Sequence, residues 1–454
     1  MCGVFGVRAP GRDVARLSYF GIYALQHRGQ ESAGIAVSED GRLTVLRDLG
    51  LVPQVFDERS LSGLKGQLAI GHTRYSTTGG NAWLNSQPLI HHGRVRTVAL
   101  GHNGNLVNAE ALRGEVDKKL ASSSDSEVIG AMIADDERPL EEAIAGAMER
   151  LEGAASVVGL ADETLFAFRD RHGFRPLVLG QLGDDYVVAS ETCALDLVGA
   201  KFVREIEPGE LVLIDDNGLR SVQALELADG GALCIFEFFY LARPDTKLSG
   251  VEVHGARVRM GERLAQEAPV EADLVLPIPD SGTPAAIGFA RAANIPFSEG
   301  LIKNRYVGRT FIQPEQGMRE QGIRMKFNPL AEVSGKRLVV VDDSIVRGST
   351  TRQIVQMLFD AGAAEVHVRV SSPPVVSPCF YGIDLASEDE MIAAHSTVEE
   401  VREAIGATSL AYISLEGLQA ATHRPASALC RACLTREYPT RVPLDAAKHR
   451  FERV

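Results

Sequence analysis

The sequence predicts two successive domains of different fold class: an α+β domain with antiparallel sheets, then an α/β domain with a parallel sheet. Two observations carry this prediction. In the first half, short β-type runs each have their own turn signals, and only a few helical stretches interrupt them. After the glycine-containing turn at residues 228–231 the pattern changes to strand, loop and helix in alternation, which is typical of a parallel sheet.

Length, charge and composition limit the possible functions. The chain has 454 residues, enough for two or three domains, and its 47 Lys+Arg against 60 Asp+Glu give a net charge of -13. An acidic surface repels phosphate, so a general nucleic-acid binder is excluded. No uncharged apolar run approaches the roughly 18 residues of a membrane span, and we expect a cytosolic protein. Six cysteines are too few for a disulfide framework in a chain this long.

The elements of the first half follow from its periodicity. Val14, Leu17, Ile22 and Leu25 recur at helical spacing before Gly29, so a helix is expected over 13–27. Two further helices are expected over 126–133 and 140–151. Strands are expected over residues 33–37, 43–46, 68–70, 95–100, 155–160, 165–168 and 186–189.

The second half begins with a buried-strand run over 273–278, followed by a turn and a helix over 284–293. A second strand over 337–341 leads through a polar loop into a helix that ends at Ala361 before Gly362. A third strand follows over 365–370. These elements form a βαβ unit with a parallel sheet.

The loop after the strand at 337–341 predicts a phosphate site. It starts with Asp342-Asp343 and continues through hydroxyl and glycine residues to the start of a helix. A helix N-terminus offers free N–H donors to a phosphate, and the two carboxylates suit a divalent cation or sugar hydroxyls. The loop lacks the lysine of a Walker motif. The alternative interpretation is an ordinary turn between a strand and a helix.

A locally basic stretch lies between residues 301 and 326 of this acidic protein. Positive charge concentrated there can neutralise a pyrophosphate, and a long polar stretch inside a compact domain is often a functional lid. The alternative is a solvated basic face. Its basic residues include Lys303, Arg305, Arg309, Arg319 and Arg324.

The N-terminus indicates a second chemistry. Because Cys2 is small, removal of Met1 is expected, which leaves a thiol and a free α-amine on one residue. That amine has an ordinary pKa of roughly 8 and can act as the base for its own thiol. A cysteine here is also compatible with a small buried apolar side chain. Four segments strengthen the catalytic interpretation: 26–32 (QHRGQES), 71–76 (GHTRYS), 101–105 (GHNGN) and 123–127 (SSDSE).

These four segments resemble, in order, the class II glutamine amidotransferases with an N-terminal nucleophile, and residues 339–351 resemble the type I phosphoribosyltransferases. Nearly the whole chain is similar to the glutamine phosphoribosylpyrophosphate amidotransferase family. The resemblance implies an αββα sandwich over 2–229, and a phosphoribosyltransferase domain with a C-terminal cluster-binding segment over 230–454. It also implies synthesis of 5-phosphoribosylamine, glutamate and pyrophosphate from glutamine and phosphoribosyl pyrophosphate, the first step of purine synthesis.

The resemblance also assigns roles to residues. Cys2 attacks glutamine, and Asn103 with the Gly104 N–H stabilises the oxyanion. Arg74 holds the α-carboxylate and Asp125 the α-ammonium, as a free amino acid requires. His27 and His102 are interpreted as structural. The other residues assigned to glutamine are Arg28, Gly29 and Tyr75. Those assigned to Mg²⁺ and ribose are Ser281, Asp342 and Asp343. Those assigned to the sugar phosphate and pyrophosphate are Lys303, Arg305, Ser344, Val346, Arg347, Gly348, Ser349 and Thr350.

The remaining cysteines suggest a metal site. Cys430 and Cys433 alone are compatible with zinc or a redox pair. With Cys234 and Cys379 they resemble the ligands of the iron-sulfur subgroup, which implies a [4Fe-4S] cluster, with four-cysteine zinc as the runner-up. Such a cluster would link distant segments of the second domain without any need for electron transfer. Cys193 is interpreted as a buried structural residue.

The resemblance further implies a homotetramer inhibited by purine nucleotides at the ribose-phosphate site. Ammonia must travel between the sites through a dry passage, which closure of the loop with Arg305, Tyr306 and Arg309 would build. A different glutamine-dependent enzyme would lack the signature at 339–351. A non-catalytic sensor of purine nucleotides or ribose phosphates is the alternative function, but it would not need Cys2, Arg74, Asn103 and Asp125 together.

Overall fold

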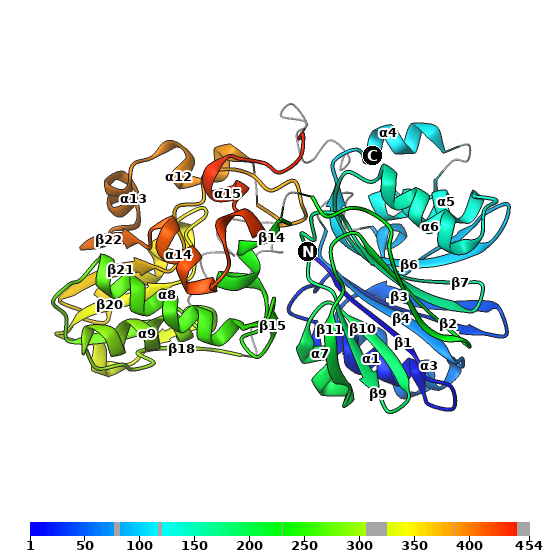
Figure 1. Ribbon diagram of the computed structural model, residues 1–454. Helices are drawn as coiled ribbons and strands as arrows, with labels where there is room; N and C mark the ends of the chain where they lie inside the picture. The colour runs from blue at the N-terminus through cyan, green and yellow to red at the C-terminus, as the bar shows by residue number, and fades with distance from the viewer. Residues whose placement is uncertain (77–81, 117–119, 229, 306–324, 386, 443–454) are drawn as a thin grey trace.

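The computed structural model describes residues 1–76, 82–116, 120–228, 230–305, 325–385 and 387–442 of the chain. Its two halves form two bodies that meet along one side (Figure 1). The first is a sandwich of two sheets between helices, and the second is a smaller α/β unit. None of the helices within the described ranges is long and apolar enough to cross a membrane.

Two antiparallel sheets form the centre of the first body. The seven-stranded sheet has the order β11-β9-β10-β1-β4-β2-β3, with β1 (Gly3–Arg8), β2 (Ser32–Glu39), β3 (Arg42–Leu49), β4 (Leu68–Arg74), β9 (Val178–Leu182), β10 (Asp185–Ala189) and β11 (Lys201–Glu205). The six-stranded sheet has the order β13-β12-β8-β7-β6-β5, with β5 (Leu89–His92), β6 (Thr97–Leu106), β7 (Gly153–Ala161), β8 (Thr164–Arg169), β12 (Glu210–Asp215) and β13 (Gly218–Gln223).

Three apolar cores hold the four layers together. Val4, Ile70 and Leu165 lie in the core between the sheets. A second core packs the seven-stranded sheet under α1 (Val14–Ala24) and α7 (Thr192–Val198), and a third packs the six-stranded sheet under α5 (Asp125–Asp135) and α6 (Leu140–Arg150). The predicted αββα sandwich is therefore confirmed.

The helix expected over 13–27 is shorter than predicted. It starts after Asp13, whose carboxylate accepts a hydrogen bond from the Arg16 N–H, and it ends at Ala24. Residues 25–29 form a turn that presses Gly29 against the neighbouring strand. A Cβ on Gly29 would lie 2.5 Å from the Thr73 carbonyl carbon, so only glycine fits there. The turn thereby brings segment 26–29 to the C-terminal end of β4.

A parallel sheet forms the centre of the second body. Its order is β17-β20-β21-β22, with β17 (Leu274–Pro277), β20 (Arg337–Asp342), β21 (Glu365–Val370) and β22 (Ser409–Tyr412). The first three of these strands, and the helices α9 (Thr283–Ala293) and α11 (Ser349–Asp360), lie where the sequence predicted them. Alternate residues of β20 enter opposite cores: Leu338 and Val340 face α11, while Val339 and Val341 face α9.

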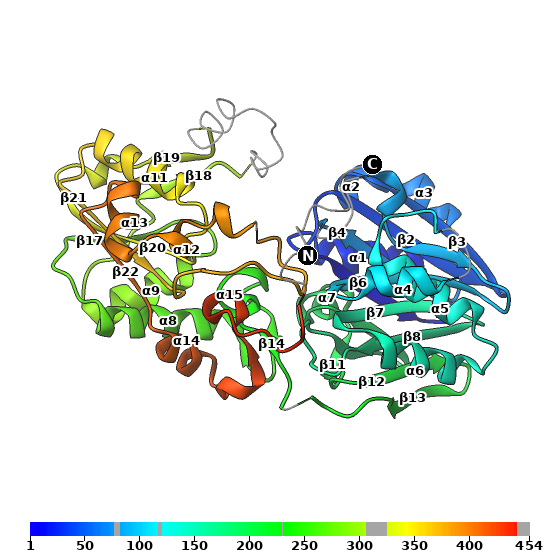
Figure 2. The same ribbon diagram turned by 90° about the horizontal axis from the view of Figure 1, so that it is seen from above.

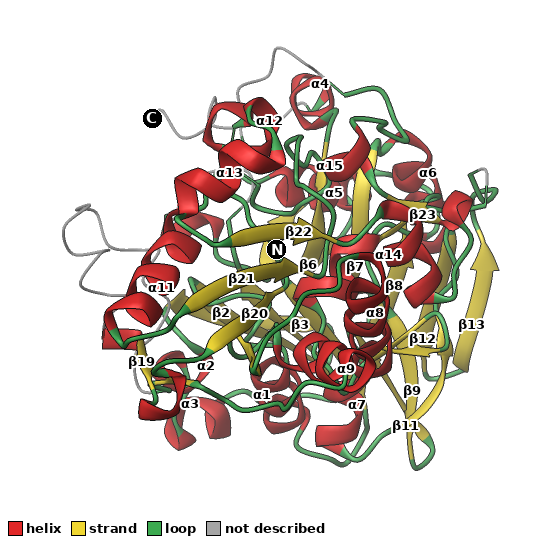
Figure 3. Cartoon of the chain, turned by 90° about the vertical axis from the view of Figure 1, so that its left-hand side faces the viewer, coloured by secondary structure: helices red, strands yellow, loops and turns green. Residues whose placement is uncertain are grey.

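Several elements were not predicted. α8 (Val253–Glu267) packs closely on α9 and covers one face of the parallel sheet, and α13 (Val398–Ile405) covers the other face beside α11 (Figure 3). α14 (Leu415–Thr422) packs on α8. The strands β1, β5, β9, β11, β12 and β13 of the first body were also not predicted.

The end of the chain returns to the junction of the two bodies. β14 (Leu233–Cys234), directly after residues 228–231, pairs in parallel with β23 (Leu429–Cys430). The short helix α15 (Ala432–Thr435) follows, and Figure 2 shows it beside β14 at the junction. Segments from the middle and the end of the chain are thus held side by side against the first body.

Candidate active sites

Cys2 is buried at the start of β1, the strand between β10 and β4. Its backbone N–H donates to Asn103 Oδ1 at 3.3 Å, and its Sγ lies 3.7 Å from the Tyr75 carbonyl oxygen. Its own carbonyl accepts a hydrogen bond from Arg28 Nε at 3.1 Å. Three segments that are distant in sequence therefore fix the main chain around this thiol.

Asn103 and Gly104 lie on β6, which extends beyond the predicted strand as far as Leu106. Asn103 is fully buried, and its Nδ2 has no hydrogen-bond partner among the described residues. A buried donor without a partner is costly unless a ligand uses it. A Cβ on Gly104 would lie 1.9 Å from the Ala154 carbonyl oxygen, so the strand passes too close for any side chain. The pair can supply N–H donors beside Cys2.

The predicted glutamine-binding residues lie around this centre. Arg74 ends β4, is buried, and has Nη1 3.7 Å from Glu31 Oε2. Tyr75 follows it and directs its carbonyl toward Cys2. Asp125 starts α5 after the N-cap Ser124, and its Oδ2 accepts a hydrogen bond from the Leu106 N–H at 3.0 Å. A cation and an anion are thus held near the ends of β4 and β6.

The α-amino group in the unprocessed chain belongs to Met1, and it donates to the Tyr75 carbonyl at 3.2 Å. Burial lowers its pKa to about 5, because loss of water disfavours the charged form. An amine at this position is therefore neutral at physiological pH.

The Arg28 side chain binds other protein groups on all sides of its guanidinium. Its guanidinium is fully buried, binds Glu237 through two hydrogen bonds of 2.7 and 3.1 Å, and also binds Glu191. Burial alone would lower its pKa, but the charges of Glu237 and Glu191 outweigh this and raise it. Since these groups and the Cys2 carbonyl occupy the guanidinium, the main chain of Arg28 is the part best placed to meet a substrate.

Sequence analysis missed the partners of Arg28 and the role of His72. Glu191, Glu237 and Arg175 are fully buried, yet they lie far from Arg28 in sequence and share no motif with it. His72 Nε2 donates a hydrogen bond to the His102 carbonyl at 3.1 Å, and burial lowers the pKa of His72 to about 3. It is therefore a neutral packing residue below β6. Only its position in segment 71–76 could have drawn attention to it.

The two predicted structural histidines have protein partners. His27 Nε2 lies 2.7 Å from Glu191 Oε1. His102 places Nδ1 3.1 Å from Ser126 Oγ and Nε2 3.0 Å from the Ala154 carbonyl. These contacts place His102 between β7 and the start of α5.

The carboxylates of the second site lie at the C-terminal end of β20. Asp343 accepts hydrogen bonds from Ser281 Oγ and from Ser344 Oγ, the latter at 2.6 Å, and its N–H donates to Asp342 Oδ1 at 2.9 Å. Burial raises the pKa of both acids, and the charge of Asp343 raises that of Asp342 further. A cation here would restore both to the ionised form.

The predicted phosphate loop follows these acids. Gly348 is the N-cap of α11 with φ +75°, a conformation that favours glycine. The loop side chains Arg347 and Ser349 are exposed, and those of Ser344, Val346 and Thr350 are partly exposed. Arg347 forms an ion pair with Glu390. The N–H groups of the first turn of α11 remain available to an anion.

The predicted pyrophosphate residues are only partly placed. Lys303 ends β18 (Leu301–Lys303) and forms an ion pair with Asp280 in the turn after β17, a partner that sequence analysis missed. Arg305 is exposed at the end of a described range. The proposed lid with Tyr306, Arg309, Arg319 and Arg324 lies in 306–324, outside the described residues.

Four cysteines converge at the junction. Cys234 and Cys430 are neighbours in the β14–β23 pairing. The Cys433 carbonyl accepts hydrogen bonds from the N–H groups of Val376 and Ser377, which brings the segment of Cys379 alongside. Cys379 Sγ accepts two backbone N–H groups at 3.3 and 3.4 Å. Such N–H contacts are typical of sulfur in metal clusters.

Burial raises the pKa of Cys234 to about 11 and raises those of Cys430 and Cys433 further. Across the described ranges, no group of three or more His, Cys, Asp or Glu side chains is placed so that it could hold a metal ion. The cysteines therefore share one buried region without forming a closed metal site. Cys193 lies elsewhere, in the core under α1 and α7.

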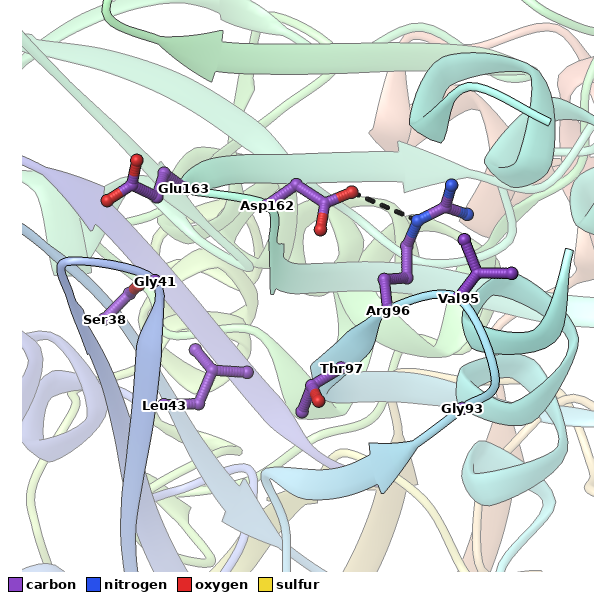
Figure 4. Close-up of a pocket in the computed structure, with 9 residues that line it drawn as sticks. All are labelled: Ser38, Gly41, Leu43, Gly93, Val95, Arg96, Thr97, Asp162 and Glu163. Carbon is purple, nitrogen blue, oxygen red and sulfur yellow. Dashed lines mark hydrogen bonds and ion pairs between the residues drawn. The ribbon is translucent and has the colours of Figure 1, made fainter. Parts of the chain in front are cut away.

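A cavity of about 330 Å³ lies at the opposite end of the sandwich (Figure 4). It is lined by the turns at residues 38–43, 93–97 and 162–163. Its one cation, Arg96, already binds Asp162 at 3.1 Å and the carbonyls of Ile133, Asp136 and Arg138. The cavity is therefore separate from the chemistry around Cys2.

Comparisons with known proteins match both halves. Residues 72–197 match the family model of a glutamine amidotransferase domain, and residues 255–372 match that of a phosphoribosyl transferase domain. The amidophosphoribosyltransferase of Mycobacterium tuberculosis is 54% identical over 463 residues, covering 98% of this chain and 88% of that protein.

Two solved structures are similar over the full length. One, described as the allosteric regulatory enzyme of purine biosynthesis, has a TM-score of 0.93 at 45% identity and covers 100% of this chain and 99% of that chain. The other is the glutamine phosphoribosylpyrophosphate amidotransferase of Bacillus subtilis in complex with ADP and GMP. It has a TM-score of 0.92 at 45% identity and covers 99% of this chain and 100% of that chain.

Proposed function

The chain belongs to the amidophosphoribosyltransferase family, and on that premise we propose which residues carry out each half of its reaction. It makes 5-phosphoribosylamine, glutamate and pyrophosphate from glutamine and phosphoribosyl pyrophosphate, the first step of purine synthesis. We assign glutamine hydrolysis to residues 2–229 and phosphoribosyl transfer to residues 230–454.

In the first half-reaction, removal of Met1 exposes the Cys2 amine, which takes the thiol proton. Burial lowers the pKa of the Met1 amine to about 5, and similar burial would keep the Cys2 amine neutral and basic. The thiolate attacks the glutamine side-chain carbonyl. The carbon–nitrogen bond then breaks, the amine returns the proton, and ammonia leaves. Water hydrolyses the thioester to release glutamate and restore the thiol.

The observation that carries this proposal is the unpaired, buried Nδ2 of Asn103 beside Cys2. Such a donor is what a tetrahedral oxyanion needs, and the N–H of Gly104 is its proposed partner. Arg74 binds the α-carboxylate and Asp125 the α-ammonium of glutamine. Arg28, Gly29 and Tyr75 line the substrate through their main chain.

In the second half-reaction, Asp342, Asp343 and Ser281 would hold Mg²⁺ and the ribose. Two adjacent buried acids with raised pKa values fit a divalent cation, and such a cation would supply positive charge for the pyrophosphate leaving group. Mg²⁺ commonly uses one or two carboxylates with substrate and water oxygens, so a closed protein cage is not required. The 5′-phosphate binds along Ser344, Val346, Arg347, Gly348, Ser349 and Thr350.

Lys303 and Arg305 bind the pyrophosphate in this proposal. Ammonia attacks the anomeric carbon, the bond to pyrophosphate breaks, and the ammonia nitrogen loses a proton to give the amine. The proposed passage for ammonia includes the loop with Tyr306 and Arg309, which lies outside the described residues.

The cysteines at the junction are proposed to hold a [4Fe-4S] cluster, with zinc as the alternative. The convergence of Cys234, Cys379, Cys430 and Cys433 and the two N–H contacts to Cys379 support a thiolate site. A cluster would supply a covalent link between β14, segment 379–383 and the C-terminal segment. Iron, zinc and acid-labile sulfide analysis of protein purified without oxygen distinguishes the two.

We further propose a homotetramer in the cytoplasm that purine nucleotides inhibit. The bound ADP and GMP of the Bacillus subtilis relative support nucleotide binding. An interface is supported by exposed apolar side chains on α1, α7 and β11, namely Phe20, Tyr23, Leu197, Phe202 and Val203. Free cysteines without disulfides among the described residues fit a reducing compartment. Sedimentation of the purified protein, with and without nucleotides, tests the assembly.

The main experiment measures glutamate release from glutamine with and without phosphoribosyl pyrophosphate and Mg²⁺. Strong stimulation by the sugar phosphate is expected, because binding in the second domain should activate the first. A rate of glutamate release that is the same with and without phosphoribosyl pyrophosphate would contradict the coupling of the two sites. No release by protein with confirmed Met1 removal would favour the alternative, a nucleotide or ribose-phosphate sensor.

A further inference from the structure

A buried network of charges connects Cys2 to the second domain. Arg28 donates from Nε to the Cys2 carbonyl at 3.1 Å and from both terminal nitrogens to Glu237. Arg28 and Glu237 are both 0% exposed at the side chain. Glu237 starts the short helical segment Glu237–Leu241, three residues after Cys234. Glu237, a residue of the second domain, therefore binds the Arg28 guanidinium, which in turn binds the main-chain carbonyl of Cys2.

The same carboxylate also connects to a second segment of that domain. Glu237 Oε1 lies 3.3 Å from Arg175 Nη1, and Arg175 donates to the Tyr381 carbonyl at 2.6 and 3.0 Å. Arg175 is fully buried as well. Two arginines of the first domain, Arg28 and Arg175, thus bind Glu237, and each of the two also binds one backbone carbonyl.

Segment 380–382 of the second domain contacts β6, the strand that carries Asn103 and Gly104. The Phe380 carbonyl accepts a hydrogen bond from Asn105 Nδ2 at 2.9 Å. Gly382 has φ +100°, and a Cβ there would lie 3.0 Å from the carbonyl carbon and oxygen of Gly104. The partner atoms are backbone, so they cannot move aside as a flexible side chain would. The second domain therefore packs against the main chain of the proposed oxyanion donor.

We propose that the second domain completes the glutamine site, with Glu237 and Gly382 as positioning residues for Cys2 and Gly104. This inference rests on the proposed function, in which Cys2 is the nucleophile and Gly104 an oxyanion donor. Neither residue touches the substrate. Glu237 fixes Cys2 through Arg28, and Gly382 permits the close approach that fixes Gly104.

A general role in domain packing is the competing explanation, and the two differ in their consequences. A packing role would affect both half-reactions, because both domains would loosen. A positioning role affects the glutamine half alone and acts on turnover, because Glu237 binds the Arg28 side chain rather than the main chain that is proposed to line glutamine, and Gly382 contacts Gly104, a proposed oxyanion donor. Ammonia added directly bypasses the first site and reports on the second site alone.

The first test compares Glu237→Gln with Glu210→Gln. Glu210 is buried and pairs with the partly exposed Arg204, at 2.6 and 2.8 Å, away from Cys2, so it is a control for losing one buried carboxylate. In E237Q, kcat with glutamine should fall about 10- to 100-fold, as a small displacement of a nucleophile predicts. KM for glutamine and the ammonia-dependent rate should stay within about threefold. Glu237→Asp should restore part of kcat.

A second test needs no change of charge. Gly382→Ala introduces a methyl group against Gly104 at φ +100°, whereas Gly218→Ala adds one at φ +95° with no atom within 4 Å. Both substitutions carry similar backbone strain. Only G382A should lower kcat with glutamine, by about tenfold or more. It should also slow alkylation of Cys2 by iodoacetamide, measured by mass spectrometry, while the ammonia-dependent rate shows that the protein is folded.

The outcomes separate the inference from the proposed function. If Cys2→Ser keeps its glutamine-dependent rate, the proposed nucleophile is wrong. If C2S is inactive with glutamine but E237Q and G382A behave like E210Q and G218A, the inference alone is overturned. A parallel fall of the glutamine-dependent and ammonia-dependent rates in both variants would also overturn it, because packing would then explain the effect.

Discussion

Cys2 in the glutamine site and the acids Asp342 and Asp343 in the ribose-phosphate site are all buried, but the charged groups of the two sites are balanced differently. Around Cys2, Arg28 is paired with Glu191 and Glu237, and Arg74 lies near Glu31. After β20, Asp342 and Asp343 lie side by side, and burial raises the pKa of each. The cations of the first site are paired with protein carboxylates, whereas the two acids of the second site would need a bound cation to balance their charge.

The two sites also differ in how the chain builds them. One strand, one turn and one helix supply most of the ribose-phosphate site. The glutamine site combines segments 26–29, 72–76 and 101–105 with Asp125 and contacts from the second domain. A single substitution in the glutamine site should therefore lower only the glutamine-dependent rate, whereas one in the ribose-phosphate site should lower both the glutamine-dependent and the ammonia-dependent rate.

The sharpest test of this separation is Cys2→Ser. Loss of the nucleophile should lower glutamine-dependent synthesis by at least about 1000-fold. Ammonia-dependent synthesis should remain within about twofold, because the second site is intact. Both rates are measured as pyrophosphate release. A matching loss with ammonia would mean that the two sites are not separable.

Asn103→Ala should have the next largest effect. Removal of one oxyanion donor typically costs about 10²- to 10³-fold in kcat. KM for glutamine should change little, because the donor acts after binding. Asn217→Ala, in an exposed turn, is the control. An unchanged kcat in N103A would remove Asn103 from the oxyanion site.

Asp343→Asn tests the ribose-phosphate site, the second of the two sites compared. A lost charge at the cation site should lower both the glutamine-dependent and the ammonia-dependent rate about 30- to 100-fold, equivalent to about 2–3 kcal/mol. Added Mg²⁺ should recover part of the rate. Asp389→Asn, an exposed acid, should change neither rate. A loss confined to the glutamine-dependent rate would contradict the assignment.

The smallest predicted effect concerns acid stability of the first domain. The pKa of His72 is lowered to about 3 when folded and is near 6.5 when unfolded. Between these values the unfolded chain binds the extra proton, so stability falls as the pH drops below 6.5, by up to about 1.4 kcal/mol per pH unit. Urea unfolding followed by Trp83, the one tryptophan, measures this in the first domain.

His72→Asn should reduce that pH dependence, because it removes the titrating group. His254→Asn, at an exposed position of α8, should leave it unchanged. An equal pH dependence in H72N and the unmodified protein would show that other groups govern acid unfolding.

Local patterns allowed much of the fold to be predicted, and the reasons are visible in single elements. The apolar run of β20, followed by Asp342 and a hydroxyl-rich turn, contains its strand, its ligands and its helix start within one segment. α8 was missed because its charged residues obscure the apolar stripe of Ala256, Met260 and Leu264. The β6 strand was predicted to end at 100, although it continues through Asn103 to Leu106.

The part of the site that could not be predicted consists of long-range charge pairs. Arg28 and Glu237 are 209 residues apart, and Arg175 and Tyr381 are 206 apart. Neither pair leaves a periodic signal, because burial of a charge depends on tertiary partners rather than on neighbours in sequence. The N-terminal motifs indicated the residues that are proposed to touch glutamine, but not the residues that hold them in place.

The parallel pairing of β14 with β23 has a consequence for biosynthesis. Leu233 emerges from the ribosome long before its partner Leu429, so the junction stays open until the last tenth of the chain has been made. The first domain can collapse early, since all strands of its two sheets precede residue 224. A nascent or truncated chain that ends before Leu429 therefore has Cys2 in place without the β14–β23 pairing, and full glutamine hydrolysis is expected only once the second domain is complete.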